Sequence, residues 1–188
     1  MQSFLYINNS IEFQESTGRS VLVSACVLEL DKVSQQNTEY RISEGNRISR
    51  NLVGKNVFYG IDFEGKHAKG EPVGFIENAW QTGRRIMAEI RIHNSKLVER
   101  IKRGVKFLFS VGGVAQFIEV VKKAGRSIRR MVDVAMSHLQ LVEPNTQVGF
   151  PNAKLERVLE INESILLVDE TGLKPDELVL LHVNLSMF

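Results

Sequence analysis

Ser110 occupies the position in the sequence that best suits a nucleophile. Apolar side chains recur at every second residue over 105–111, the pattern of a strand with one buried face, and Gly112 and Gly113 follow. Glycines adopt backbone conformations that other residues avoid and let another chain segment come close. A serine at the open end of such a strand has an accessible Oγ near backbone N–H groups, which are the two requirements of acyl transfer. The plainer interpretation is a strand that ends in a glycine turn with a solvated serine.

Two of the four histidines are placed to act as a general base or to support one. His67 lies in a glycine-flanked loop before a predicted hairpin, where an imidazole can be reached and oriented. His138 lies within the apolar strand pattern of 132–142, and burial of its ring would require hydrogen-bond partners, a role that another histidine can fill. An exposed loop residue and a satisfied core residue are the plainer interpretations. His93 suits a capping role, and His182 suits a core or an interface.

The composition excludes several other classes of site. With 188 residues, the chain can form one domain or a domain with appendages, and its net charge of +2 does not indicate nucleic acid as a partner. The single cysteine, Cys26, cannot form an internal disulfide. No metal-binding pair of histidines, carboxylate cluster or phosphate loop is present, so we expect no metal and no cofactor. We also expect no signal peptide and no membrane span, and hence a soluble protein.

The elements that would position these residues are mostly strands. Short apolar runs rich in β-branched residues predict a mainly β (α+β) fold, a barrel or sandwich with one or two short helices. One predicted helix begins after Asn94 or Ser95, buries an apolar face and ends before Gly104. The predicted strands cover residues 4–7, 11–13, 20–30, 52–59, 72–80, 84–93, 105–113, 114–121 and 131–142, and residues 31–50 are predicted to be a loop with at most a short helix.

Two segments allow more than one interpretation. Residues 122–130 carry five basic residues in nine positions, which is typical of a solvated turn, then of a surface for an acidic partner, and last of a nucleic-acid module. The basic segment lacks interleaved aromatic residues for stacking on bases. From residue 155 onward, helical and strand patterns compete. We therefore predict a β-rich domain over 1–153 and a C-terminal segment, a tail or an interface, over 154–188.

Several motifs fall in an order that resembles a known family. Gly65-Lys-His67 precedes Glu71-Pro-Val-Gly74, and an apolar hairpin, a helix ending in Lys102-Arg-Gly104, and Phe109-Ser-Val-Gly-Gly113 follow. A strand and a proline-containing loop complete the order. Over about residues 20–153 this arrangement is similar to the prohead (capsid maturation) serine proteases of tailed bacteriophages and related archaeal viruses, which are distantly similar to the herpesvirus assemblin.

The resemblance implies a role for each matching residue. Ser110 matches the nucleophile and His67 the general base, and His138 stands where many phage members have a glutamate. The herpesvirus relatives use a second histidine there, so we interpret the departure as a Ser–His–His variant. The alternatives are a site weakened by loss of its acid, or Asp133 as the third member, although Asp133 is predicted to lie on the opposite strand face.

The resemblance also implies a mechanism and a setting. Backbone N–H groups of Val111, Gly112 and Gly113 are candidates for the oxyanion hole, with Arg129 or Arg130 as a charged supplement. The expected activity is a serine endopeptidase that cleaves scaffold and major capsid proteins, and itself, inside the viral procapsid in the host cytoplasm. A homo-oligomer is compatible with this role, and we expect neither membrane nor nucleic acid as a partner. The alternative is a non-catalytic viral assembly or structural protein on the same fold.

Overall fold

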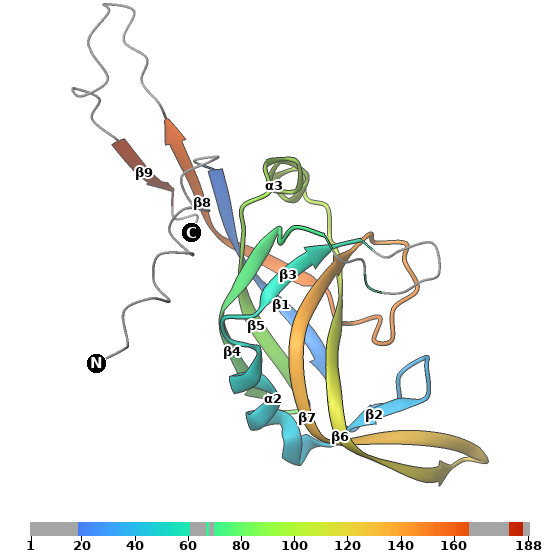
Figure 1. The fold of residues 1–188 in the computed structure, drawn as a ribbon. Coiled ribbons are helices and arrows are strands. Elements are labelled where there is room, and N and C mark those ends of the chain that lie inside the picture. The colour runs from blue at the N-terminus through green and yellow to red at the C-terminus, as the bar shows by residue number, and fades with distance from the viewer. Residues whose placement is uncertain (1–18, 61–66, 68–69, 166–180, 186–188) are drawn as a thin grey trace, which may run out of the picture.

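The computed structural model of the chain describes residues 19–60, 67, 70–165 and 181–185, and consists mostly of strands (Figure 1). The predicted strands at 4–7 and 11–13 lie outside the described residues. The elements are β1 (Arg19–Glu29), β2 (Thr38–Tyr40), a 3-10 turn η1 (Ile42–Glu44), α2 (Gly45–Leu52), β3 (Asn56–Tyr59), β4 (Gly74–Thr82), β5 (Arg85–Ile92), α3 (Ser95–Lys102), β6 (Leu108–Lys123), β7 (Arg126–Val142), β8 (Leu155–Ile165) and β9 (Leu181–Leu185).

The strands form one mixed nine-stranded sheet that closes on itself. Its order is β2-β7-β3-β4-β5-β1-β8-β9, with β6 paired to β7. The N–H of Phe109 in β6 donates to the carbonyl of Ala153 at 2.7 Å, and the N–H of Leu155 donates back to the carbonyl of Phe107 at 2.9 Å. These bonds join β6 to the start of β8, and therefore turn the central strands into a ring around the core. Because β8 (Leu155–Ile165) also pairs with β1, this strand extends the same sheet.

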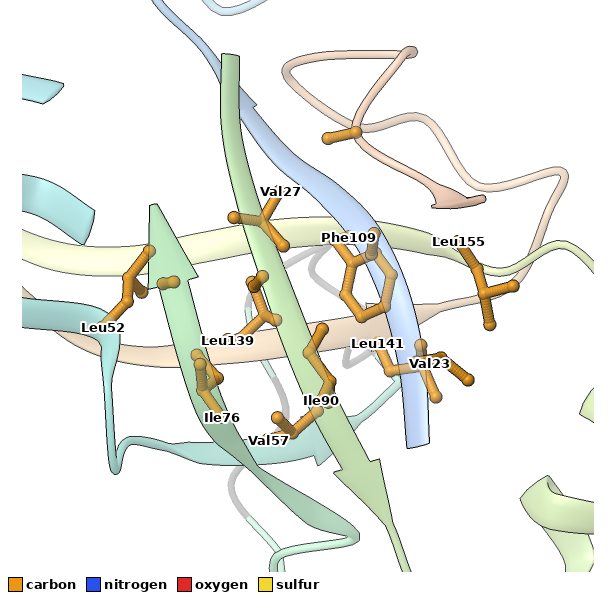
Figure 2. Packing of buried hydrophobic residues seen from close by; sticks show 14 of the residues in the cluster. Val23, Val27, Leu52, Val57, Ile76, Ile90, Phe109, Leu139, Leu141 and Leu155 are labelled. Carbon is orange, nitrogen blue, oxygen red and sulfur yellow. The ribbon is translucent and has the colours of Figure 1, made fainter. Parts of the chain in front are cut away.

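The core lies inside this ring (Figure 2). Figure 2 shows Phe109 of β6 beside Leu139 and Leu141 of β7, with Val23 and Val27 of β1 facing them. All five side chains are at most 1% exposed. Alternate side chains of a strand point to opposite faces of the sheet. The two neighbours of a core-facing residue therefore point away from the core. The packing therefore fixes which residues of β6 and β7 face away from the core.

The β4–β5 hairpin and helix α3 confirm two predictions. The hairpin turns at Gly83-Arg84, between the paired residues Thr82 and Arg85, close to the gap between the predicted strands 72–80 and 84–93. Helix α3 is capped by Asn94, whose side-chain oxygen accepts a hydrogen bond from the N–H of Leu97 at 3.2 Å. It is followed by Gly104 at φ 85°. This helix places the chain at the start of β6.

Two segments differ from the prediction. Residues 31–50 contain a strand that was not predicted, β2, and most of α2, the short helix that the prediction allowed, whose Ile48 is fully buried. Leu52 ends α2 rather than beginning a strand, because its side chain completes the apolar face of that helix. The basic residues 122–130 lie mostly in β6 and β7, and the turn is the dipeptide Ala124-Gly125, with φ 46° and 77°. Two positive φ values are what a tight two-residue hairpin turn requires.

A substitution of Phe109 tests the core packing that orients β6, the strand that carries Ser110. We expect Phe109→Ala to lower the free energy of unfolding by about 3–5 kcal/mol, because it opens a cavity in the core. Phe117→Ala is the matched control on the same strand, since Phe117 is 61% exposed whereas Phe109 is 1% exposed. We expect Phe117→Ala to change the free energy of unfolding by less than about 0.5 kcal/mol. Urea denaturation gives both values, and equal losses would contradict the packing.

Candidate active site

Ser110, His67 and His138 form a continuous hydrogen-bonded relay. Nε2 of His67 lies 2.8 Å from Oγ of Ser110, and Nδ1 of His67 lies 2.7 Å from Nε2 of His138. The two imidazole rings meet edge to face, at 80° with 4.9 Å between centroids. Ser110 comes from β6, His138 from β7 and His67 from the connection between β3 and β4. One ring therefore contacts both partners through its two nitrogens.

The register of β6 and β7 brings two of these residues to one face. Ser110 lies opposite Gln140, and Gly112 lies opposite His138. Directly opposite residues of an antiparallel pair project to the same face of the sheet. Because Phe109 packs into the core, Ser110 and His138 both lie on the other face. His67 then contacts both side chains on that face.

Strand β6 does not end at the glycines, which corrects the prediction. It continues from Leu108 to Lys123, and Gly112 serves a close approach rather than a turn. A Cβ built on Gly112 would lie 2.0 Å from Cε1 and 2.4 Å from Nε2 of His138. Any side chain at this position would therefore push the imidazole out of its place over the backbone.

A β-bulge in β7 aims His138 at the site. Gly112 pairs with His138 and Gly113 pairs with Met136, so Ser137 is an extra residue in β7. Val134 and Met136 face the core before the bulge, and Leu139 does so after it. The regular alternation in the sequence placed His138 on the apolar face, and that interpretation is wrong. The bulge leaves no clear signal in the residue pattern.

The ring of His138 has further contacts on the site face. Its Nδ1 lies 2.9 Å from Oγ of Ser137, and this hydroxyl donates to the backbone carbonyl of Gly112 at 3.1 Å. The ring of Phe58 in β3 meets it edge on, with centroids 5.7 Å apart. Sequence reasoning missed Ser137 and Phe58, because neither residue type nor spacing marks them.

The surroundings of His67 favour its neutral form. Burial lowers the pKa of His67 below its ordinary value of 6.5, and charge on the neighbouring His138 lowers it further. The ring is thus unprotonated near pH 7. A neutral imidazole can accept a proton from a hydroxyl, which is the task of a general base.

A cavity of about 120 Å³ lies beside Ser110. Phe109, Val111, Met131 and Phe150 are among the apolar residues of its wall, and Tyr40 and Arg129 add polar groups. Its complete lining is Val27, Ser34, Gln36, Thr38, Tyr40, Phe109, Ser110, Val111, Arg129, Met131, Gly149 and Phe150. Most of these residues face the core, whereas Oγ of Ser110 is directed to His67 on the other face of β6.

The two candidate arginines are placed differently. Arg129 lines the cavity and donates from Nη2 to the carbonyl of Gln36 at 3.3 Å. Arg130 donates from Nε to the buried carboxylate of Glu39 at 3.0 Å, and it lies 3.6 Å from a carboxylate oxygen of Glu119. Arg129 therefore lines the cavity that Ser110 also lines, and Arg130 does not.

The three candidate backbone donors point in two directions. In an antiparallel pair, the N–H groups of alternate residues point to alternate sides. Phe109 directs its N–H away from β7, toward Ala153. By the same alternation, the N–H groups of Val111 and Gly113 point away from β7 and that of Gly112 points toward it. In the described part of the chain, β6 beyond Phe109 pairs with β7 alone, so Val111 and Gly113 direct their N–H groups to an open strand edge.

Two carboxylates, Asp133 in the middle of β7 and Glu143 directly after it, are engaged elsewhere. Asp133 forms an ion pair with Arg47 of α2. Glu143 accepts two hydrogen bonds from Arg100 at 2.6 and 2.7 Å and one from the hydroxyl of Tyr59. The bonds from Arg100, then that from Tyr59, lower the pKa of Glu143 to about 2. His138, rather than Asp133, is the residue that contacts His67.

His93 is not among the residues of the relay. Nε2 of His93 lies 3.1 Å from the carbonyl of Pro72, at the junction before α3. Within the described ranges, no three His, Cys, Asp or Glu side chains gather in a way that could hold a metal ion.

Comparisons of the chain with protein-family models, with curated proteins and with solved structures find no match.

Gly112→Ala tests the close contact between β6 and the ring of His138. We expect the added methyl group to displace the ring and break its hydrogen bond to His67, because the Cβ would lie well inside van der Waals distance. The measurement is the low-field proton resonance of this hydrogen bond in the NMR spectrum, which should disappear. Gly70→Ala is the control, since a Cβ there meets nothing within 4 Å. A resonance that survives in Gly112→Ala would contradict the contact.

Proposed function

We propose that the protein is a serine endopeptidase with Ser110 as the nucleophile, His67 as the general base and His138 as the third member. The observation that carries this proposal is the relay of two hydrogen bonds, 2.8 and 2.7 Å long, through one imidazole that is neutral near pH 7. The resemblance of the motif order to the prohead proteases supports the same assignment.

The first half of the reaction forms an acyl-enzyme. Oγ of Ser110 bonds to the scissile carbonyl carbon while its proton passes to Nε2 of His67. The carbonyl oxygen becomes an oxyanion, for which the N–H groups of Val111 and Gly113 at the open edge are candidate donors. His67 then gives the proton to the leaving nitrogen as the C–N bond breaks, which frees an amine.

The second half regenerates the enzyme. A water loses a proton to Nε2 of His67 and attacks the ester carbon, and the Oγ–C bond breaks as that proton returns to Oγ. Throughout, His138 accepts a hydrogen bond from Nδ1 of His67 and orients the ring. A neutral imidazole stabilises the imidazolium less than a carboxylate does, so we expect slow turnover. Slow turnover suffices where each capsid matures once.

The proposed substrates are viral scaffold and major capsid proteins and the chain itself, within a procapsid in the host cytoplasm. An extended peptide can add to the open edge of β6 through backbone hydrogen bonds. In the part of the chain that the structure describes, no helix has the length and apolar character of a membrane span.

The competing proposal is a non-catalytic assembly protein. Exposed apolar side chains on the outer part of β6, at Val114, Phe117, Ile118 and Val120, favour a contact with another protein. This surface is compatible with both proposals, whereas the relay has no role in a non-catalytic assembly protein. Reactivity of Ser110 therefore separates the two.

A fluorophosphonate probe tests the nucleophile. We expect the probe to label Ser110, as located by peptide mass spectrometry, and we expect Ser110→Ala and His67→Gln to lower labelling and self-cleavage at least about 1,000-fold. Ser127→Ala and His93→Gln are matched controls away from the relay and should react as the wild type does. Unchanged processing by Ser110→Ala would remove the nucleophile assignment, and absence of labelling in assembled samples would favour the assembly protein.

The pH dependence of Ser110 labelling by the probe tests the protonation state of His67. Protonated His67 cannot accept the Ser110 proton, so reactivity falls as the pH decreases through its pKa. Because burial and His138 lower this pKa, we expect the acid limb to be centred below pH 6.5. The measurement is the second-order rate of probe labelling between about pH 4 and pH 8. A limb centred clearly above pH 6.5 would contradict the buried, neutral ring.

A further inference from the structure

We propose that Ser137 is a positioning residue that fixes the direction of all hydrogen bonds in the relay. This inference rests on the proposed function, because it concerns how His138 serves His67. Ser137 touches neither Ser110 nor a reacting atom in the proposed mechanism. Its hydroxyl lies between Nδ1 of His138, at 2.9 Å, and the carbonyl of Gly112, at 3.1 Å.

The carbonyl of Gly112 gives the relay a fixed end. A backbone carbonyl accepts hydrogen bonds and cannot donate one. The hydroxyl of Ser137 has a single proton, so donating to Gly112 leaves its oxygen to accept from Nδ1–H of His138. This requirement makes His138 the tautomer with a proton on Nδ1 and a lone pair on Nε2.

The tautomer of His138 in turn determines which nitrogen of His67 carries the proton. Nε2 of His138, carrying a lone pair, accepts from Nδ1–H of His67 over 2.7 Å. Nε2 of His67 is then the unprotonated nitrogen that faces Oγ of Ser110 at 2.8 Å. Four consecutive hydrogen bonds run in one direction and end on the carbonyl. Only this direction leaves His67 ready to accept the Ser110 proton.

The opposite direction of the four hydrogen bonds is disfavoured, because it breaks the bond from Ser137 to the carbonyl of Gly112. If His138 carried its proton on Nε2, Nδ1 would accept from Ser137 and the hydroxyl could not donate to Gly112. Two oxygens 3.1 Å apart would then face each other without a proton between them. His67 would carry its proton on Nε2, donate it to Ser110 and be unable to act as a base. The two tautomers of an imidazole are otherwise close enough in energy that a single neighbour decides between them.

The bulge explains why Ser137 reaches both groups. It is the extra residue opposite Gly112, next to His138 in the chain and beside the Gly112 carbonyl across the ladder. Ser137 is exposed, so water can replace its hydroxyl in a variant. Water donates or accepts equally well, however, and does not select a tautomer. We therefore expect a partial loss of function on its removal rather than a complete one.

Nitrogen NMR of protein labelled with ¹⁵N-histidine tests this role directly, because the two neutral tautomers differ in their nitrogen shifts. In the wild type at neutral pH, we expect His138 to carry its proton on Nδ1. In Ser137→Ala we expect a mixture of tautomers and a kcat/KM for peptide cleavage about 3–10-fold lower, the effect of one hydrogen bond. Ser137→Thr keeps the hydroxyl and should restore both values. Ser127→Ala, on the same strand, should change neither.

Three results would overturn the role of Ser137. One is a wild-type His138 with its proton on Nε2, which needs no variant. Another is a Ser137→Ala protein that keeps the Nδ1 tautomer, and the last is an altered tautomer with unchanged kcat/KM. If the wild type neither cleaves peptides nor reacts with the fluorophosphonate, the peptidase proposal fails. The nitrogen spectra of wild type, Ser137→Ala and Ser137→Thr then still decide whether the hydroxyl sets the tautomer.

Discussion

The site depends on one steric condition, the contact of the His138 ring with the bare backbone of Gly112. Across the β6–β7 ladder, the ring lies where a Cβ on residue 112 would stand, 2.0 Å from its nearest atom. The bulge at Ser137 aims the ring at this gap, and the core packing of Phe109 and its neighbours holds the two strands in register. Backbone geometry, rather than a long-range ion pair, therefore places the second histidine of the relay.

The electrostatic character of the relay follows from that placement. His67 and His138 are both imidazoles, and the nearby carboxylate of Glu143 is taken up by Arg100 and Tyr59. Burial keeps His67 neutral, and its partner contributes orientation more than charge. Such a relay depends on tautomers, because each neutral ring has one donor and one acceptor nitrogen. The acceptor-only carbonyl of Gly112 settles that choice for the whole chain of hydrogen bonds.

Much of the fold, and the three residues of the relay, could be predicted from the sequence. An apolar run rich in β-branched residues identified β1, strand patterns identified the β4–β5 hairpin and most of β7, and Asn94 and Gly104 marked the ends of α3. The order of motifs brought His67, Ser110 and His138 together before any distance was known. Local patterns could not reveal the bulge at Ser137, since a single extra residue has no compositional signature. They also could not show that β6 continues through its glycines, because Gly112 is required by a partner 26 positions away.

The most direct test of the account is a crystal structure of the protein after reaction with a fluorophosphonate. It measures the covalent state of Ser110 and the positions of both imidazoles at once. We predict a bond between Oγ of Ser110 and phosphorus, with Nε2 of His67 within hydrogen-bond distance of the adduct. Nε2 of His138 should remain close to the 2.7 Å found here from Nδ1 of His67. An unmodified Ser110, or either ring turned out of hydrogen-bond reach in the adduct, would contradict it.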